Sequence, residues 1–219
     1  CSSDLYIACR VKDQLGIRVA AIARGDDVHA WPEQTPALQA HFPLVFDKVD
    51  LLMANSRNLG NDAKKWMVPG KERNVEVVYN GIEHSRYRPV ADDKERQQIR
   101  QQFKMADQVK YLTCVATPIV LKGWVELLDA IKGLGNEFDG WQLLMVAPRR
   151  LGPDALDLEA MGKSLGITER LFYMGSLSPD DLAKVLRASD AFVLPSYNEG
   201  MANALLEAMA SGLACITTE

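Results

Sequence analysis

The stretch "NEGMANALLE", Asn198–Glu207, is the part of this sequence that most strongly indicates its fold and function. It continues as "AMASG", and between its two glutamates Asn203 is the only residue that is neither apolar nor small. On a helix from about Gly200 to Ser211, the residues Gly200, Asn203, Glu207 and Ser211 share one face, and every other position is Met, Ala or Leu. A helix that is apolar nearly all round is predicted to be buried.

Glu207 therefore needs a partner. A buried carboxylate costs several kcal/mol unless it is paired or hydrogen-bonded. Two interpretations fit: a protein cation or capping network, or a ligand. A pair of ligand hydroxyls would suit it, because one carboxylate accepts two hydrogen bonds, as acidic residues do on a ribose in dinucleotide sites. The polar stripe alone leaves both interpretations open.

Short apolar runs are predicted to be strands that are covered on both faces, because they are continuous rather than alternating. They are Ile17–Ala23, Asp50–Ala54, Val75–Tyr79, Tyr111–Ala116, Trp141–Ala147, Leu171–Gly175, Ala191–Pro195 and Leu213–Thr218. The best-marked helices between them are Trp124–Leu134 and Ser178–Ala188, which begins with a serine cap followed by proline. Strands that alternate with helices at this spacing predict a parallel α/β sheet.

A change of composition predicts two domains. The stretch "NGIEHSRYRP", Asn80–Pro89, carries a turn signal, charges and a proline, and the polar helical pattern "DDKERQQIRQQF" follows it. We therefore expect a boundary near Arg86–Val90, with residues 1–88 in one domain and 89–219 in the other. The sequence lacks an initiator methionine and stops straight after a predicted strand, so we expect a fragment of a longer protein.

Composition excludes several classes of protein. The net charge of −4 argues against a broad nucleic-acid footprint, which would be basic. No apolar run approaches the roughly 18 residues that a membrane span needs. The four cysteines contain no C-x-x-C pair, and the three histidines share no metal-ligand spacing, so we expect no metal and no cofactor. This cysteine usage is typical of a reducing cytosol. We expect a cytoplasmic protein, and a short basic patch could still give it peripheral contact with the inner face of a membrane.

Glu199 has two interpretations as well. It could simply be a favourable charge at a helix N-terminus, worth about 0.3–1 kcal/mol. Yet this N-terminus follows the predicted strand Ala191–Pro195, and ligands of open α/β sheets bind at the carboxyl ends of the strands. Free helix amides, with Gly200 permitting close approach, form an anion site there. An acid beside an anion site is reasonable if it binds the hydroxyls of a sugar next to a phosphate, which points to a nucleotide sugar.

The stretch "TPIVLKGWVELLDA", Thr117–Ala130, is a second candidate for phosphate binding. A predicted strand ends at Ala116, and Lys122 and Gly123 open the next helix. A lysine in that place can meet a phosphate with the help of the helix amides. The alternative is an ordinary solvated lysine, which is the commoner environment of this residue.

The C-terminal stretch "PSYNEGMANALLEAMASGLACITT" resembles the donor-site signature of family 4 retaining glycosyltransferases. Two glutamates separated by seven residues and followed by "LLEAMASG" are its most specific feature. The segments "LKGWVELLDAI", "LFYMGSLSPDDLAKVLRASDAFVLPS", "VDLLMANS" and "VVYNGIEHSRYRP" follow the family in order, so the resemblance covers about Ile17–Thr218. It implies an α/β fold of GT-B type, with two Rossmann-like domains that are both incomplete here. Residues 1–88 would be the latter part of the acceptor domain, and 89–219 the donor domain without its last elements.

The resemblance also implies roles for the matching residues. Glu207 would hold the ribose, Glu199 would contact the donor sugar, and Lys122 would meet the diphosphate. The remaining donor-binding residues would be Gly200, Met201, Ala202, Asn203 and Thr117. The implied reaction transfers a sugar from a UDP- or GDP-type donor to a glycan, a lipid-linked molecule or a small molecule. It would proceed with retention, through an oxocarbenium-like transition state and without a protein metal.

Several positions depart from the family pattern. The family usually has a glycine-arginine pair at 116–117, where this chain has "AT", and that arginine is a phosphate cation. Arg149 or Arg150 could supply the missing charge. Glu83 stands where an aspartate is usual, and Arg24 stands where a histidine is usual, which affects the acceptor side.

Three functions are therefore compatible with the sequence. The first is a retaining glycosyltransferase whose 219 residues do not turn over alone, because the acceptor wall is incomplete. The second is a module or pseudoenzyme that binds a nucleotide sugar without transfer, an interpretation that Thr117 and Arg24 favour. The third is a structural or interaction domain without a ligand.

Overall fold

A computed structural model describes residues 2–25, 28, 36–71, 73–149, 152 and 154–218. The chain divides into two compact units. The first comprises Cys1–Gly81 with Glu199–Met201, and the second comprises Ile82–Asn198 with Ala202–Glu219. The boundary predicted near Arg86–Val90 lies on the C-terminal side of this division and stays a prediction.

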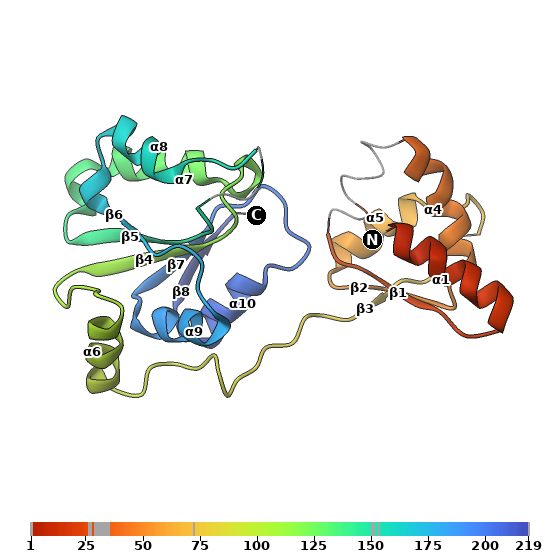
Figure 1. Cartoon of the computed structure of the whole chain (residues 1–219), viewed down its shortest axis with the longest axis horizontal. Coiled ribbons are helices and arrows are strands. Elements are labelled where there is room, and N and C mark those ends of the chain that lie inside the picture. Colours follow the sequence, from red (N-terminus) through yellow and green to blue (C-terminus); the bar gives the residue numbers. More distant parts are fainter. Residues whose placement is uncertain are drawn as a thin grey trace. The chain divides into compact units, whose positions relative to one another are not determined.

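The first unit contains a parallel sheet with the strand order β1-β2-β3 (Figure 1). Its strands are β1 (Ala20–Ala23), β2 (Leu51–Ala54) and β3 (Glu76–Val77), and its helices are α1 (Ser2–Leu15), α4 (Pro36–Lys48) and α5 (Arg57–Lys65). Helix α5 begins where the hydroxyl of Ser56 accepts a hydrogen bond from the amide of Leu59. Buried side chains from β2, α4 and α5, such as Leu52, Phe46 and Leu59, form the core of this unit.

The second unit is built on a five-stranded parallel sheet with the order β6-β5-β4-β7-β8 (Figure 1). Its strands are β4 (Lys110–Val115), β5 (Trp141–Val146), β6 (Leu171–Tyr173), β7 (Ala191–Leu194) and β8 (Ala214–Thr217). Its helices are α6 (Asp93–Gln102), α7 (Trp124–Leu134), α8 (Leu158–Leu165), α9 (Pro179–Ala188) and α10 (Asn203–Ala210). Three short 3-10 turns complete it, namely η1 (Val120–Lys122), η2 (Gly135–Phe138) and η3 (Thr168–Arg170).

Helices cover both faces of this sheet. On β5, Leu143 and Met145 point to the face that α7 and α8 cover, whereas Leu144 and Val146 point to the face that α6 and α9 cover. Because successive side chains of a strand point to opposite faces, a strand that is covered twice must be apolar at every position. This explains why the sequence shows continuous apolar runs.

The predicted elements are largely confirmed. All eight predicted strands form, with ends that differ from the prediction by a few residues. Helix α9 begins as expected, with the hydroxyl of Ser178 accepting from the amide of Asp181 at 3.2 Å and with Pro179 in its first turn.

The prediction for the last helix is wrong in two respects. Helix α10 begins at Asn203 rather than near Gly200, so Gly200 precedes it, and it ends at Ala210. It is also not buried all round, since Ala208 is its one fully buried residue and Met209 is 58% exposed. One side of the helix packs on α9, β7 and β8, and Ala208 lies in the core cluster on that side.

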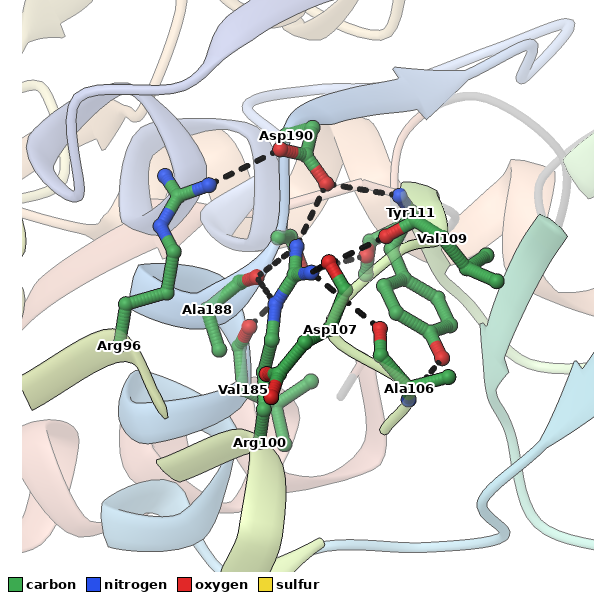
Figure 2. Close-up of polar contacts among 11 residues, drawn as sticks. Arg96, Arg100, Ala106, Asp107, Val109, Tyr111, Val185, Ala188 and Asp190 are labelled. Atoms are coloured by element: carbon green, nitrogen blue, oxygen red, sulfur yellow. Dashed lines mark hydrogen bonds and ion pairs between the residues drawn. The ribbon is translucent and has the colours of Figure 1, made fainter. Parts of the chain in front are cut away.

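A buried arginine joins the elements at the amino edge of the second sheet (Figure 2). The side chain of Arg100, at the end of α6, is only 5% exposed. Its guanidinium donates to the carbonyl of Ala188 at 3.0 and 3.1 Å, to that of Val109 at 3.0 Å and to that of Asp107 at 2.9 Å. It also donates to the carboxylate of Asp190 at 2.9 Å. An arginine carries five N–H donors and no acceptor, so this set of acceptors compensates for its burial.

Asp190 completes this cluster. Its second carboxylate oxygen accepts from Arg96 at 2.9 Å, and the oxygen that faces Arg100 also accepts from the amide of Tyr111 at 2.8 Å. Tyr111 lies at the start of β4, and Asp190 immediately precedes β7. The cluster therefore fixes where two neighbouring strands begin.

We expect Arg100→Met to destabilise the protein by about 3–5 kcal/mol, the usual cost of removing one member of a buried ion pair. The change leaves Asp190 without its buried cation, and it removes the donor to the carbonyls of Ala188 and Val109. Urea unfolding followed by circular dichroism measures the loss. Arg149→Ala is the matched control, because this arginine is 72% exposed in its ion pair with Glu159 and should contribute less than about 1 kcal/mol. Equal losses for the two variants would contradict the structural role of Arg100.

Candidate functional site

The order of the strands creates a switch point between β4 and β7. The chain passes from β4 to β5 and β6 on one side, and then returns to β7 and β8 on the other side. In open α/β sheets, ligands bind in the crevice at the carboxyl ends of the strands on either side of such a point. Thr117 and Lys122 follow β4, and the stretch that leads to α10 follows β7. The fold therefore brings two of the predicted regions to one edge.

The loops after β4 and β7 are tied together. Gly123 has a left-handed backbone with φ 70°, and a Cβ on it would lie 1.9 Å from the carbonyl oxygen of Pro195. The carbonyl of Leu121 accepts from the amide of Tyr197 at 3.0 Å and from the hydroxyl of Ser196 at 3.2 Å. Glycine is required at position 123 for both its conformation and its close approach to the neighbouring backbone.

The backbone around Thr117 is held by a buried tryptophan. The indole of Trp124, which is fully buried at the start of α7, donates to the carbonyl of Thr117 at 2.8 Å. The carbonyl of Pro118 accepts from the amide of Leu156 at 2.6 Å. Lys122 is the last residue of η1, immediately before Gly123, and it is half-buried. The hydrogen bonds to Thr117 and Pro118 give the loop that carries it a defined backbone.

Glu207 is half-buried and lies on α10, four residues after Asn203. Burial raises the pKa of the Glu207 carboxyl, although the nearby Tyr87 hydroxyl and the charge of Arg86 oppose that shift. The surroundings of Glu207 therefore include a tyrosine hydroxyl as well as a cation, and the sequence interpretations named only a cation or capping network, or a ligand.

Tyr87, whose hydroxyl acts on the pKa of Glu207, was not among the residues predicted from the sequence. It is only 5% exposed and packs against residues of α9 and α10, including Ala183 and Ala208. A tyrosine in a polar stretch just before Pro89 carries an apolar ring in otherwise charged surroundings, and this was the available signal. Glu207 lies far along the chain from Tyr87, so no local pattern could have shown that the two residues are near each other.

The segment before Tyr87 is anchored on α9. The amides of Arg86 and Tyr87 donate to the carbonyl of Glu83 at 3.0 and 2.9 Å. Arg86 forms an ion pair with Asp180 at 2.9 Å, and Arg187 donates to the carbonyl of Arg86 at 3.0 Å. The ring of Tyr87 is therefore presented by a segment with a fixed conformation.

A sequence model of the family described as glycosyl transferases group 1 matches residues 95–219. The chain belongs to this family. The matched region contains strands β4–β8, the tied loops at the switch point and the helix that carries Glu207.

The chain is also similar to curated proteins and to solved structures. The chain is 26% identical over 202 residues to N-acetyl-alpha-D-glucosaminyl L-malate synthase of Bacillus anthracis, covering 92% of this chain and 50% of that protein. It is 24% identical to D-inositol 3-phosphate glycosyltransferase of Corynebacterium kroppenstedtii, covering 90% of this chain and 43% of that protein. The chain thus spans about half the length of these relatives.

The structure is similar to that of HepE from Anabaena, crystallised with UDP and glucose, with a TM-score of 0.81, 18% identity, and coverage of 99% of this chain and 57% of that chain. Sucrose-phosphate synthase from Thermosynechococcus elongatus gives a TM-score of 0.78, 19% identity, and coverage of 97% and 53%. At these identities the likeness concerns the fold alone. It confirms the predicted fold class, α/β of GT-B type with two parallel-sheet units.

The other predicted site residues of this group 1 chain divide between the two units. Ala202 caps α10 and Asn203 begins it, both in the second unit. Glu199–Met201 belong to the first unit, where a Cβ on Gly200 would lie 2.3 Å from Leu59. The assigned roles of these residues stay predictions.

The residues that depart from the family pattern lie in different surroundings. Arg149, which follows β5, pairs with Glu159 at 3.2 Å and lies over the ring of Tyr173 at 5.3 Å. Arg150 lies outside the described residues. Glu83 is exposed in the turn before Tyr87, and Arg24 is exposed immediately after β1.

Over the described part of the chain, no three or more His, Cys, Asp or Glu side chains gather as they would around a metal ion. Among the helices of that same part, none is long and apolar enough to cross a membrane.

Gly123→Ala should destabilise the protein by at least about 2 kcal/mol, since the left-handed backbone costs a residue with a Cβ about 1–2 kcal/mol and the overlap with Pro195 adds to it. Gly133→Ala is the control, because Gly133 is exposed within α7 and a Cβ there meets nothing within 4 Å. This second change should stabilise by about 0.5–1 kcal/mol. Urea unfolding measures both, and a harmless Gly123→Ala would show that the two loops are not tied.

Glu207→Gln should raise stability at pH 7, and the gain should vanish as the pH falls through the ordinary pKa of glutamate. Burial raises the pKa of Glu207 in the folded protein, so the contribution of this group to stability is present at low pH and is lost as the pH rises. Glutamine does not titrate. Unfolding curves of both proteins between pH 4 and 8 measure the difference.

The matched control for this titration is Glu126→Gln. The hydroxyl of Tyr197 donates to Glu126 at 2.7 Å and lowers the pKa of that carboxyl, so here the stability is present at neutral pH and is lost as the pH falls. The two variants should therefore change stability with opposite dependence on pH. If the stability change had the same dependence on pH in both variants, the conclusion that burial raises the pKa of Glu207 would be wrong.

Proposed function

We propose that this protein is the donor-binding part of a retaining glycosyltransferase that moves a sugar from a nucleotide-diphosphate sugar to an acceptor. The observation that carries the proposal is the edge of the second sheet, where the loop of Lys122 is tied to the loop after β7 and α10 follows with Glu207. This edge lies inside the region that matches group 1 glycosyl transferases.

Each residue has a chemical role in this proposal. Glu207 accepts hydrogen bonds from the two ribose hydroxyls, and Glu199 contacts hydroxyls of the donor sugar. The amides of Gly200, Met201 and Ala202 lie near sugar and phosphate. Lys122 meets the diphosphate and stabilises the charge that develops on the leaving group. Asn203 and Thr117 complete the donor-binding set.

The donor is proposed to be a UDP- or GDP-type sugar. The structure of HepE was determined with UDP and glucose, which supports a nucleotide sugar as the ligand class. The names of the curated relatives include L-malate and D-inositol 3-phosphate, so a small molecule remains one candidate acceptor beside a glycan or a lipid-linked molecule. The chain spans about half of those relatives, and we expect it to bind donor without transferring the sugar alone.

A second candidate is a module that binds a nucleotide sugar without transfer. Thr117 supports it, because the family usually has a phosphate-binding arginine there. Arg149 is the described residue that could replace this arginine. It is already paired with Glu159 and lies over the ring of Tyr173. A longer parent protein with both glutamates and no transfer to any acceptor would favour this candidate.

Calorimetry of the 219-residue chain with UDP, GDP and their glucose and mannose conjugates tests the proposal. We expect one nucleotide to bind and Glu207→Ala to weaken it at least about tenfold, since a hydrogen bond to a charged group contributes about 1.5–3 kcal/mol. Lys122→Ala should weaken the binding of UDP and GDP more than the binding of UMP and GMP, measured in the same way.

Lys132→Ala is the matched control for the lysine, because Lys132 is an exposed residue in the last turn of α7. It should leave every affinity unchanged. Absence of binding to all nucleotides would instead favour a structural or interaction domain, and equal binding by Glu207→Ala would contradict the role of Glu207.

A further inference from the structure

We propose that Tyr197 is a positioning residue, which holds the loop of Lys122 where the lysine can meet the diphosphate of the donor. The inference rests on the proposed function, in which Lys122 binds that diphosphate. It gives a task to an exposed aromatic side chain on the loop after β7. It also predicts which property of a ligand depends on this side chain, namely the number of its phosphates.

The first argument is that Tyr197 contacts the chain on both sides of Lys122. Its hydroxyl donates to the carboxylate of Glu126, in the first turn of α7, at 2.7 Å. Its amide donates to the carbonyl of Leu121, the residue immediately before Lys122, at 3.0 Å. One residue of the loop after β7 is thus bonded to the backbone before the lysine and to the helix after it.

The second argument is that the residues before Tyr197 hold the same segment. The hydroxyl of Ser196, which is 5% exposed, donates to the carbonyl of Leu121 at 3.2 Å. The carbonyl oxygen of Pro195 lies so close to Gly123 that a Cβ there would be 1.9 Å from it. Both residues that flank the lysine are therefore held by the loop after β7, and the hydroxyl of Tyr197 extends this contact to α7.

The third argument concerns the kind of contact that Tyr197 makes. Its side chain is 62% exposed, so the ring buries little apolar surface, and packing does not explain an aromatic residue at this place. The hydrogen bond lowers the pKa of Glu126 and raises the pKa of Tyr197. At neutral pH the carboxylate therefore stays an acceptor and the hydroxyl stays a donor.

The fourth argument concerns the freedom that binding removes. A lysine side chain is a flexible four-carbon stem, and a phosphate that binds its ammonium must order it. A mobile backbone beneath the lysine would add a second ordering cost. A loop that is held before the ligand arrives avoids this cost and keeps the ammonium within reach of one phosphate. Loss of the Tyr197 hydroxyl should therefore weaken ligands that use Lys122 and spare ligands that do not.

Tyr197→Phe tests the inference, because it removes the hydroxyl and keeps the ring and the backbone amide. We expect UDP affinity at pH 7, measured by calorimetry, to fall about threefold to tenfold, the range for one hydrogen bond, and UMP affinity to stay unchanged. A merely structural role would change the two affinities alike or leave both unchanged. In a Lys122→Ala background, Tyr197→Phe should have no further effect on UDP affinity.

Variants of Glu126 test the same hydrogen bond from its acceptor side. Glu126→Ala removes the acceptor and should lower UDP affinity as much as Tyr197→Phe does. Glu126→Gln keeps an oxygen that can accept from the hydroxyl, so it should retain most of the UDP affinity. Adding Glu126→Ala to Tyr197→Phe should cause no further loss, since both changes remove one interaction.

Tyr111→Phe is the matched control. Its hydroxyl accepts from the amide of Ala106 at 2.7 Å at the opposite, amino edge of the same sheet, so its loss should reduce stability and leave the affinities for UDP and UMP unchanged. Hydrogen exchange followed by mass spectrometry adds a measurement that needs no nucleotide. Tyr197→Phe should speed exchange of the backbone amides in 119–123 and leave exchange in β5 unchanged.

The outcomes separate the inference from the function on which it rests. If the unaltered chain binds neither UDP nor GDP, the proposed function fails, and a role of Tyr197 at a diphosphate fails with it. If Lys122→Ala lowers UDP affinity relative to UMP while Tyr197→Phe leaves both affinities unchanged, only the inference about Tyr197 is wrong. Equal losses of UDP and UMP affinity, or unchanged exchange in 119–123, would also overturn it. If GDP alone binds, the same comparisons apply with GDP and GMP.

Discussion

The second unit depends on the burial of one guanidinium. Arg100 on α6 reaches the carbonyl at the end of α9, the loop before β4 and the carboxylate before β7. The carbonyls of Ala188 and Val109 would lose these hydrogen bonds without the arginine, and Asp190 would keep only its contacts with Arg96 and the amide of Tyr111. The arginine likewise could not be buried without them. This mutual requirement fixes the amino edge of the sheet, and strand register follows because β4 and β7 start at defined places.

The opposite, carboxyl edge of the sheet carries the loops after β4 and β7. The loops after β4 and β7 leave neighbouring parallel strands, so they emerge close together whatever their sequence. Their finer arrangement depends on the close approach of Gly123 to Pro195 and on the two hydrogen bonds to Leu121. The buried arginine cluster thus lies at one edge, and candidate site residues such as Lys122 lie at the other, where open α/β sheets generally bind ligands.

The sequence predicted those features that depend on local pattern. All eight strands could be found because a strand covered on both faces is continuously apolar, as Leu143 to Val146 illustrate. The start of α9 was marked by Ser178 and Pro179. The start of α10 was not, because Gly200 to Ala202 share its composition while adopting another backbone.

Interactions between distant residues were out of reach of the sequence. Arg100 and Ala188 are 88 positions apart, and no pattern on α6 distinguishes this arginine from Arg96. At the candidate site, the partial burial of Glu207 was predictable, whereas the nearby Tyr87 and Arg86 were not. The roles of Glu199 and Lys122 came from family resemblance and stay predictions.

The surroundings of Glu207 bear on what this carboxylate can do. Burial raises the pKa of its carboxyl, and the nearby Tyr87 hydroxyl and the charge of Arg86 only partly oppose that shift. A carboxylate that is costly to bury gains from further hydrogen-bond donors, and it has about four lone-pair sites to accept them. A ligand that brings two hydroxyls supplies such donors, which is the physical reason for the role proposed for Glu207 at a ribose.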